Sequence, residues 1–123
     1  MGRKKGVKSP YWLPANKRWE IKHVCLCYND WKKRIAWKGD SMAEDERRFL
    51  NRAIALVEEA ARQSGPGIEK HLLFAITSGV PYVKLDGIPC GVDYFYERRK
   101  KCFYLLDKAL THEERETLMR YKS

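Results

Sequence analysis

Four consecutive cations, at positions 98–101, form the densest group of side chains in the sequence that could bind a ligand by charge. Arginine forms paired hydrogen bonds with guanine or phosphate, whereas lysine binds phosphate as a compact charge. The 123 residues carry 25 Lys and Arg against 16 Asp and Glu, a formal net charge of +9. The excess lies in residues 1–38 and 89–110, so we expect these segments to face a polyanion such as nucleic acid.

Other candidate chemistries are weaker. Cys25 and Cys27 form H-x-C-x-C with His23, but residues two apart on a helix do not share a face, which makes a poor zinc site. We expect the four cysteines to be free thiols. The histidines lie in separate segments without a neighbouring nucleophile motif, and no phosphate-binding or dinucleotide-binding fingerprint is present. We therefore predict no enzyme activity, no metal and no other cofactor.

Helices must position these side chains, because apolar residues recur at spacings of three and four along the chain. One helix is predicted over 16–37, with a break near 29–30 as an alternative. A second runs from Ser41 to about Gln63, where Ser41 and Glu44 match a capping box. A third covers 68–77, and residues 81–85 form one short turn. A long helix enters after Gly87 and ends near 110, and Thr111 with Glu114 matches a second capping box.

No stretch alternates as a strand does, so the predicted fold class is all-α, a small helical domain with a C-terminal helix-turn-helix. We divide it into a basic arm (1–10), an N-terminal helical hairpin (11–64) and a helix-turn-helix region (65–123), in one compact domain. No apolar run approaches the roughly 18 residues of a membrane span. The N-terminus also lacks the apolar stretch of a secretory signal, which favours the cytoplasm.

The long helix has two faces at helical spacing. The predicted buried face carries Arg99 at its edge and otherwise consists of Val92, Phe95, Tyr96, Cys102, Phe103, Leu106 and Leu110. The opposite face is net basic and comprises Asp93, Tyr94, Glu97, Arg98, Lys101 and Lys108. An apolar helix ending in Ser-Gly and a short turn precede this helix, which is the outline of a helix-turn-helix.

Residues 72–106, LLFAITSGVPYVKLDGIPCGVDYFYERRKKCFYLL, resemble region 4 of sigma factors and the related phage late-gene transcription regulators called RinA and ArpU. In that group an apolar helix ends at a glycine, a Ser-Tyr pair begins the next helix, and a Gly-Ile-Ser entry leads into the recognition helix. Gly79 and Tyr82 match the second helix, and Gly87, Ile88 and Pro89 match the entry. The segment between Gly79 and Ile88 is shorter than in sigma region 4, so a single helical turn is expected there.

Residues 11–35 and 98–108 are similar to small phage-encoded proteins of Gram-positive bacteria, so the resemblance covers about residues 11–110. It implies a recognition helix whose first turns touch base edges. Arg98 is the best candidate for a bidentate guanine contact. The base-contacting candidates are Cys90, Gly91, Asp93, Tyr94, Glu97 and Arg98. Lys84 and Lys101 are the candidates for contacts with DNA phosphates. Arg3, Lys4 and Lys5 are the candidates for an arm that follows a DNA groove or the DNA backbone.

Two functions are consistent with these patterns. The first is a phage DNA-binding transcription regulator in the cytoplasm of a bacterial host, with double-stranded DNA, host RNA polymerase and a second copy of the chain as partners. The second is a phage interaction or structural protein, such as a packaging or morphogenesis component, that associates through its aromatic helices. Four tryptophans in so small a chain favour some protein contact, because Trp is a common interface anchor.

Overall fold

The computed structural model describes residues 9–121, which fold into six α-helices and two 3₁₀ turns without a strand among them. The predicted all-α class is therefore confirmed. The elements are α1 (Ala15–Leu26), α2 (Tyr28–Lys38), η1 (Gly39–Ser41), α3 (Glu44–Ser64), α4 (Glu69–Ser78), η2 (Tyr82–Lys84), α5 (Val92–Ala109) and α6 (His112–Met119). No helix within residues 9–121 has the length and apolar character needed to cross a bilayer.

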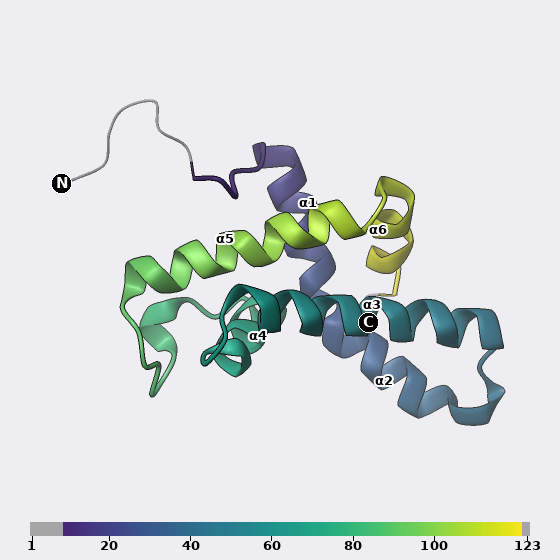
Figure 1. Ribbon diagram of the computed structural model, residues 1–123. Coiled ribbons are helices and arrows are strands. Elements are labelled where there is room, and N and C mark those ends of the chain that lie inside the picture. The colour runs from purple at the N-terminus through teal and green to yellow at the C-terminus, as the bar shows by residue number, and fades with distance from the viewer. Residues whose placement is uncertain (1–8, 122–123) are drawn as a thin grey trace.

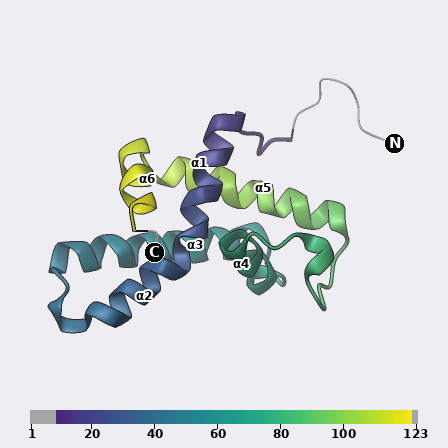
Figure 2. The ribbon, with the colours of Figure 1, turned by 180° about the vertical axis from the view of Figure 1, so that it is seen from behind.

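The two longest helices, α3 and α5, lie side by side and provide the centre of the fold (Figure 1). On the far side, α1 crosses this pair, and α2 and α4 pack beside it (Figure 2). The short α6 returns to α1. Apolar residues at helical spacing fill the space between them, including Leu50 and Val57 of α3, Phe95 and Leu106 of α5, and Ile21 of α1.

The predicted helix over 16–37 is two helices that meet at Cys27, two residues before the alternative break point. The Cys27 amide donates to the carbonyl oxygen of Val24, three residues back, where an α-helix would use residue 23. Beyond the break, Tyr28 donates a hydrogen bond to Glu58 of α3, and the Trp31 indole donates to the carbonyl of Leu118 in α6 over 3.2 Å. The change of direction lets both rings reach these partners.

The two predicted capping boxes have opposite outcomes. Ser41 does not cap α3, because its hydroxyl donates to the Lys38 carbonyl at 2.6 Å and completes η1. The N-cap is Ala43, without a side-chain cap, so the predicted start at Ser41 is wrong. The Thr111 box is confirmed: its hydroxyl accepts from the Glu114 amide at 3.1 Å, and its own amide donates to the Glu114 carboxylate at 2.9 Å.

Candidate nucleic-acid interface

A turn held by specific hydrogen bonds joins α4 to α5. Gly79 ends α4 with a φ of 78°, a left-handed conformation that glycine adopts without strain. The single turn η2 then packs on α5: the Tyr82 amide donates to the Tyr96 hydroxyl at 3.0 Å, and the Tyr82 hydroxyl donates to the Cys90 carbonyl at 2.7 Å. The Tyr82 ring lies 5.3 Å from that of Phe95. Along the chain, α4 is thus followed by the single turn η2, a loop over 85–91 and α5.

The predicted base-contacting residues divide into two groups. Gly91 at the N-cap of α5 and Asp93 and Tyr94 in its first turn are exposed, and so is Lys84 of η2. The remaining described candidates are partly buried, namely Cys90, Glu97, Arg98 and Lys101. Arg3, Lys4 and Lys5 lie outside the described residues. Val92, which was expected on the buried face, is 44% exposed, because it lies in the first turn at the entry end of α5.

Residues 9–11 lie against α5 where Glu97 and Lys101 were expected to face solvent. The Ser9 hydroxyl donates to the Glu97 carboxylate at 2.6 Å. The Tyr11 ring lies 5.7 Å from that of Tyr104, edge to face, and the Lys101 ammonium lies 5.8 Å from the centre of the Tyr11 ring. This segment therefore occupies part of the face that was expected to be open for a ligand.

Arg98 is held in place by several groups. Its guanidinium carbon lies 5.7 Å from the centre of the Tyr11 ring and 5.3 Å from that of Tyr94, and its Nη1 donates to the Ser64 carbonyl at 3.3 Å. Arg98 was expected on the outward polar face of the helix, and there its side chain is half-buried by these contacts. Helical spacing placed Arg98 relative to α5 alone, and it carried no information about Tyr11.

A cleft of about 270 Å³ lies between α1 and α5. One side is a stripe of α1 at positions i, i+3, i+4 and i+7, and the other is an i, i+4 pair of α5. The Arg99 guanidinium lies 4.8 Å from the centre of the Tyr96 ring, and burial lowers its pKa below the ordinary value because the charge is partly withdrawn from water. The lining residues are Ala15, Arg18, Trp19 and Lys22 of α1 and Arg99 and Phe103 of α5.

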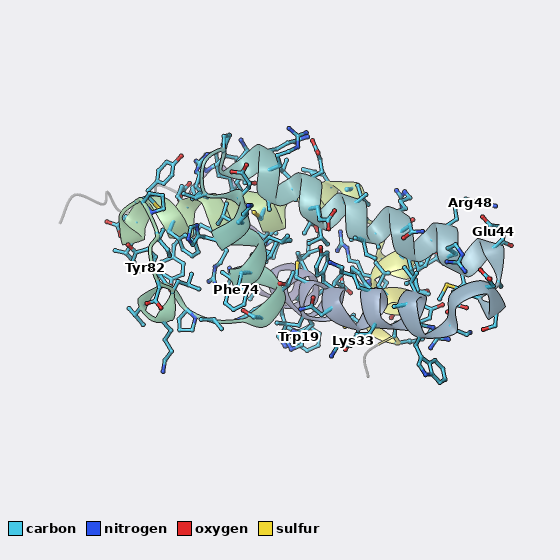
Figure 3. All side chains as sticks on the ribbon, turned by 90° about the horizontal axis from the view of Figure 1, so that it is seen from below. Trp19, Lys33, Glu44, Arg48, Phe74 and Tyr82 are labelled. Carbon is cyan, nitrogen blue, oxygen red and sulfur yellow. The ribbon has the colours of Figure 1, made fainter. Side chains whose placement is uncertain are left out.

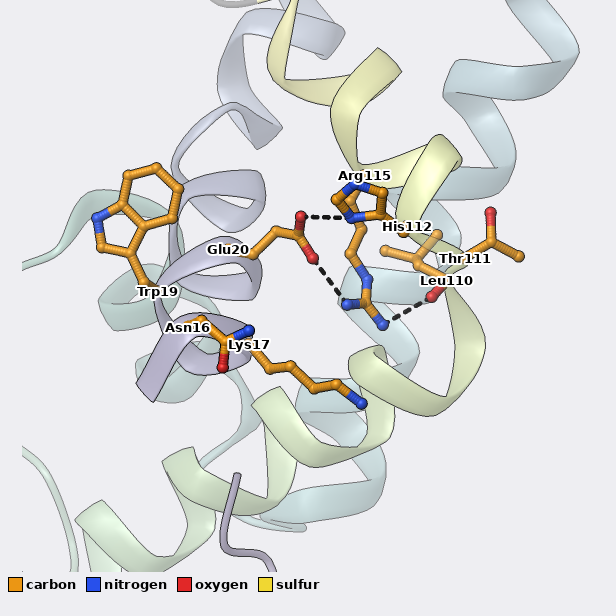
Figure 4. Close-up of a pocket in the computed structure, with 8 residues that line it drawn as sticks. All are labelled: Asn16, Lys17, Trp19, Glu20, Leu110, Thr111, His112 and Arg115. Atoms are coloured by element: carbon orange, nitrogen blue, oxygen red, sulfur yellow. Dashed lines mark hydrogen bonds and ion pairs between the residues drawn. The ribbon is translucent and has the colours of Figure 1, made fainter. Parts of the chain in front are cut away.

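The cleft contains three cations and no carboxylate. Within residues 9–121, neither Arg18, Lys22 nor Arg99 forms an ion pair. Glu20, the nearest acid in sequence, points to the other side of α1 (Figure 4). Sequence reasoning missed this cleft, although Arg18 and Lys22 on either side of Trp19 at helical spacing were a usable signal.

A second cleft, of about 490 Å³, lies between α1 and α6 (Figure 4). Glu20 binds Arg115 Nη1 and His112 Nδ1, each at 2.8 Å, while Lys17, which also lines the cleft, forms no ion pair with another described residue. Arg115 Nη2 also donates to Asp107 Oδ1 and to the carbonyl of Leu110, both at 2.8 Å. Because Arg115 of α6 binds Glu20 of α1 and Asp107 of α5, the arrangement works as a clamp between helices.

The cysteines have structural surroundings. All four are free, and three of them are buried, with Cys90 partly exposed. Burial raises the pKa of the Cys25 thiol strongly, and it raises the pKa of Cys102 to about 11, so both stay protonated at neutral pH. In the part of the chain from 9 to 121, no three His, Cys, Asp or Glu side chains are grouped so that they could hold a metal ion.

The chain matches no protein-family model, and no curated protein or solved structure is detectably similar to it.

Proposed function

We propose that this protein binds double-stranded DNA and regulates transcription of phage genes, with α4, η2 and α5 acting as a helix-turn-helix. One observation carries the proposal. The first turn of α5 lies at one end of the molecule (Figure 1), where Gly91, Asp93 and Tyr94 are exposed, and Lys84 of η2, the 3₁₀ turn in contact with α5, is exposed as well. Recognition helices present their N-terminal residues to base edges in the major groove in this manner.

The residues at this end of the molecule have different roles in the proposed DNA contact. Tyr94 is 49% exposed and lies against the Arg98 guanidinium, so a base contact made by one would involve the other. Lys84 is the phosphate-binding group of the turn. The bacterial host cytoplasm, host RNA polymerase as a partner and self-association belong to the same proposal.

The test is a titration of the full chain with duplex fragments of its own phage genome, at several salt concentrations. If about four to six phosphates are neutralised, log K falls against log salt with a slope of roughly −4 to −5. Lys84→Ala should weaken binding to all duplexes and reduce the slope by about 1. The matched control is Lys108→Ala, an exposed lysine near the other end of α5, which should change neither quantity. A flat salt response, or equal effects of the two variants, would contradict the proposal.

A second candidate function is supported by exposed aromatic side chains. Trp37 is 86% exposed, Trp19 58% and Phe74 54%, and Trp19 projects outward from α1 (Figure 3). Exposed Trp residues commonly anchor protein interfaces. For an interaction or structural component, light scattering should show a concentration-dependent assembly that Trp37→Ser abolishes. A monomer at every concentration, with or without this substitution, would count against self-association.

A further inference from the structure

We infer that the cleft between α1 and α5 binds one nucleotide unit, with its phosphate among Arg18, Lys22 and Arg99 and its base against the indole of Trp19. This inference goes beyond the proposed function, because a single nucleotide needs neither a duplex nor a helix-turn-helix. None of the residues that line the cleft belongs to the first turn of α5.

The phosphate position follows from charge. Three cations from two helices line a space with no lining carboxylate, and none of them forms an ion pair with another described residue. Like charges that line one cleft repel each other, and a bound anion would lower that repulsion. Arg99 is already oriented, since its guanidinium lies against the rings of Tyr96 and Phe103 at 4.8 and 5.7 Å. Arg18 is oriented by donating from Nη1 to the Leu13 carbonyl at 3.1 Å.

The base position follows from the indole. Trp19 lines the same cleft and is 58% exposed, while its ring centre lies 4.1 Å from that of His23, which supports it from one side. An aromatic face beside a basic groove is the arrangement that binds unpaired bases by stacking. Bases that are paired and stacked within a duplex cannot present that face, so the ligand is an unpaired nucleotide.

The size of the cleft limits the ligand. Its volume of about 270 Å³ lies just below the roughly 300–1,000 Å³ of ordinary small-molecule sites, which suits one nucleotide unit. Ala15, whose side chain is a single methyl group, leaves room on the α1 side, and buried Phe103 forms an apolar wall on the α5 side. The nucleotide is either free or part of a single strand, and both present the same phosphate and base.

The experiment follows the Trp19 indole and Arg99 guanidinium signals by NMR in the isotope-labelled full chain. The probes are adenosine 5′-monophosphate, adenosine, inorganic phosphate and a short single-stranded oligonucleotide. We expect the monophosphate to shift both signals, and adenosine and phosphate to bind about tenfold more weakly, a loss of about 1.4 kcal/mol for each missing part. Tighter binding of the oligonucleotide than of the monophosphate would assign the site to a strand, and the reverse would assign it to the free nucleotide.

Matched variants separate the cleft from general attraction to a basic protein. Lys22→Ala removes a cation of the cleft, and Lys33→Ala removes an exposed cation of α2 outside it (Figure 3). We expect Lys22→Ala to weaken monophosphate binding about tenfold, equivalent to about 1.4 kcal/mol, and Lys33→Ala to leave it within about twofold. Trp19→Ala should bring monophosphate binding down to that of phosphate, whereas Trp37→Ala should not. Both lysines are exposed, and far-UV circular dichroism checks that each variant is folded.

Three results would overturn the inference: no shift with any nucleotide, equal losses for Lys22→Ala and Lys33→Ala, or a monophosphate that binds no better than phosphate. None of them depends on duplex binding. Loss of nucleotide binding with a normal duplex titration would refute the cleft alone. Normal nucleotide binding without any duplex binding would refute the regulator proposal alone.

Discussion

Arg115 of α6 and Glu20 of α1 are joined by an ion pair of 2.8 Å although 95 residues separate them in sequence. Both side chains are largely withdrawn from water, with 7% and 14% exposed. The same guanidinium binds Asp107, whose side chain is 8% exposed, again at 2.8 Å. One arginine therefore serves as counter-charge to two largely buried carboxylates, and Glu20 has His112 as a second partner.

Replacing Arg115 with alanine should lower the free energy of unfolding by about 3–5 kcal/mol, because breaking a buried pair leaves uncompensated charge. Urea denaturation followed by circular dichroism measures the change. Arg120→Ala is the control, since Arg120 is exposed just beyond α6, and it should stay within about 0.5 kcal/mol. A loss below about 1 kcal/mol for Arg115→Ala would show that the clamp does not stabilise the fold.

The capping box at the start of α6 should make stability depend on acid. The Glu114 carboxylate accepts a hydrogen bond from the Thr111 amide and lies beside Arg52, and these contacts lower its pKa. Its charged form is therefore favoured in the folded state. The resulting stability is present above the ordinary Glu pKa of about 4.3 and is lost as the pH falls through the lowered value.

Glu114→Gln should remove this part of the acid dependence. Unfolding free energies of the two proteins measured between neutral pH and about pH 3 should converge as the pH falls. Thr111→Ala tests the other half of the box and should cost about 0.5–2 kcal/mol at neutral pH. A constant difference between Glu114→Gln and the unmodified chain at every pH would rule out the explanation.

Gly65 is required by packing. A Cβ at this position would lie 2.5 Å from Leu72 Cδ1 and 2.7 Å from Ile68 Cγ1, and both side chains are buried. Gly65→Ala should therefore destabilise the protein by about 1–3 kcal/mol through overpacking. Gly91→Ala is matched to it, because nothing lies within 4 Å of the added methyl group and the φ of −78° suits alanine. Equal melting temperatures for the two variants would contradict this prediction.

Arg98→Ala should relax sequence preference on duplex DNA by about 1–3 kcal/mol at one base pair, if Arg98 contacts guanine. The measurement is a competition between specific and scrambled duplexes, with melting curves alongside, because loss of the contact with Ser64 also affects the fold. Phe103→Ala is the control for that effect: Phe103 is 4% exposed, so it should cost about 3–5 kcal/mol of stability and act on binding only through unfolding. An unchanged ratio in folded Arg98→Ala would exclude base reading by this residue.

The parts of the fold that depend on neighbours in sequence were predictable. Leu50 and Val57 of α3 and Phe95 and Phe103 of α5 lie on the buried faces that their helical spacing indicates. The Thr111 box formed because all of its partners lie within three residues. Ser41 matched the same pattern, but a second local partner, the Lys38 carbonyl, took its hydroxyl. Local sequence patterns therefore predict the helices well, but they do not predict which of two nearby hydrogen-bond partners a side chain will bind.

The parts of the site that depend on distant residues were not predictable. The placement of Tyr11 against Arg98 joins segments 87 residues apart, and no periodicity within α5 indicates it. The basic cleft likewise requires that α1 cross α5 at the turn that carries Arg99, which follows from how all the helices pack. Helical spacing indicates the stripe of α1. The identity of the facing helix and the lack of a carboxylate in the cleft can be seen only in the three-dimensional structure.

The hydrogen bond from Trp31 to Leu118 has a consequence for synthesis on the ribosome. Translation produces α1 and α2 well before residues 112–119. Trp31 of α2 and the helix α1 can therefore contact α6 only after these residues have been synthesised. Contacts between segments so far apart in sequence form late, because a long loop has to close before they contribute. We therefore expect nascent chains that stop before α6 to keep α2 and its aromatic side chains open to chaperones, and the closing step to follow completion of residue 118.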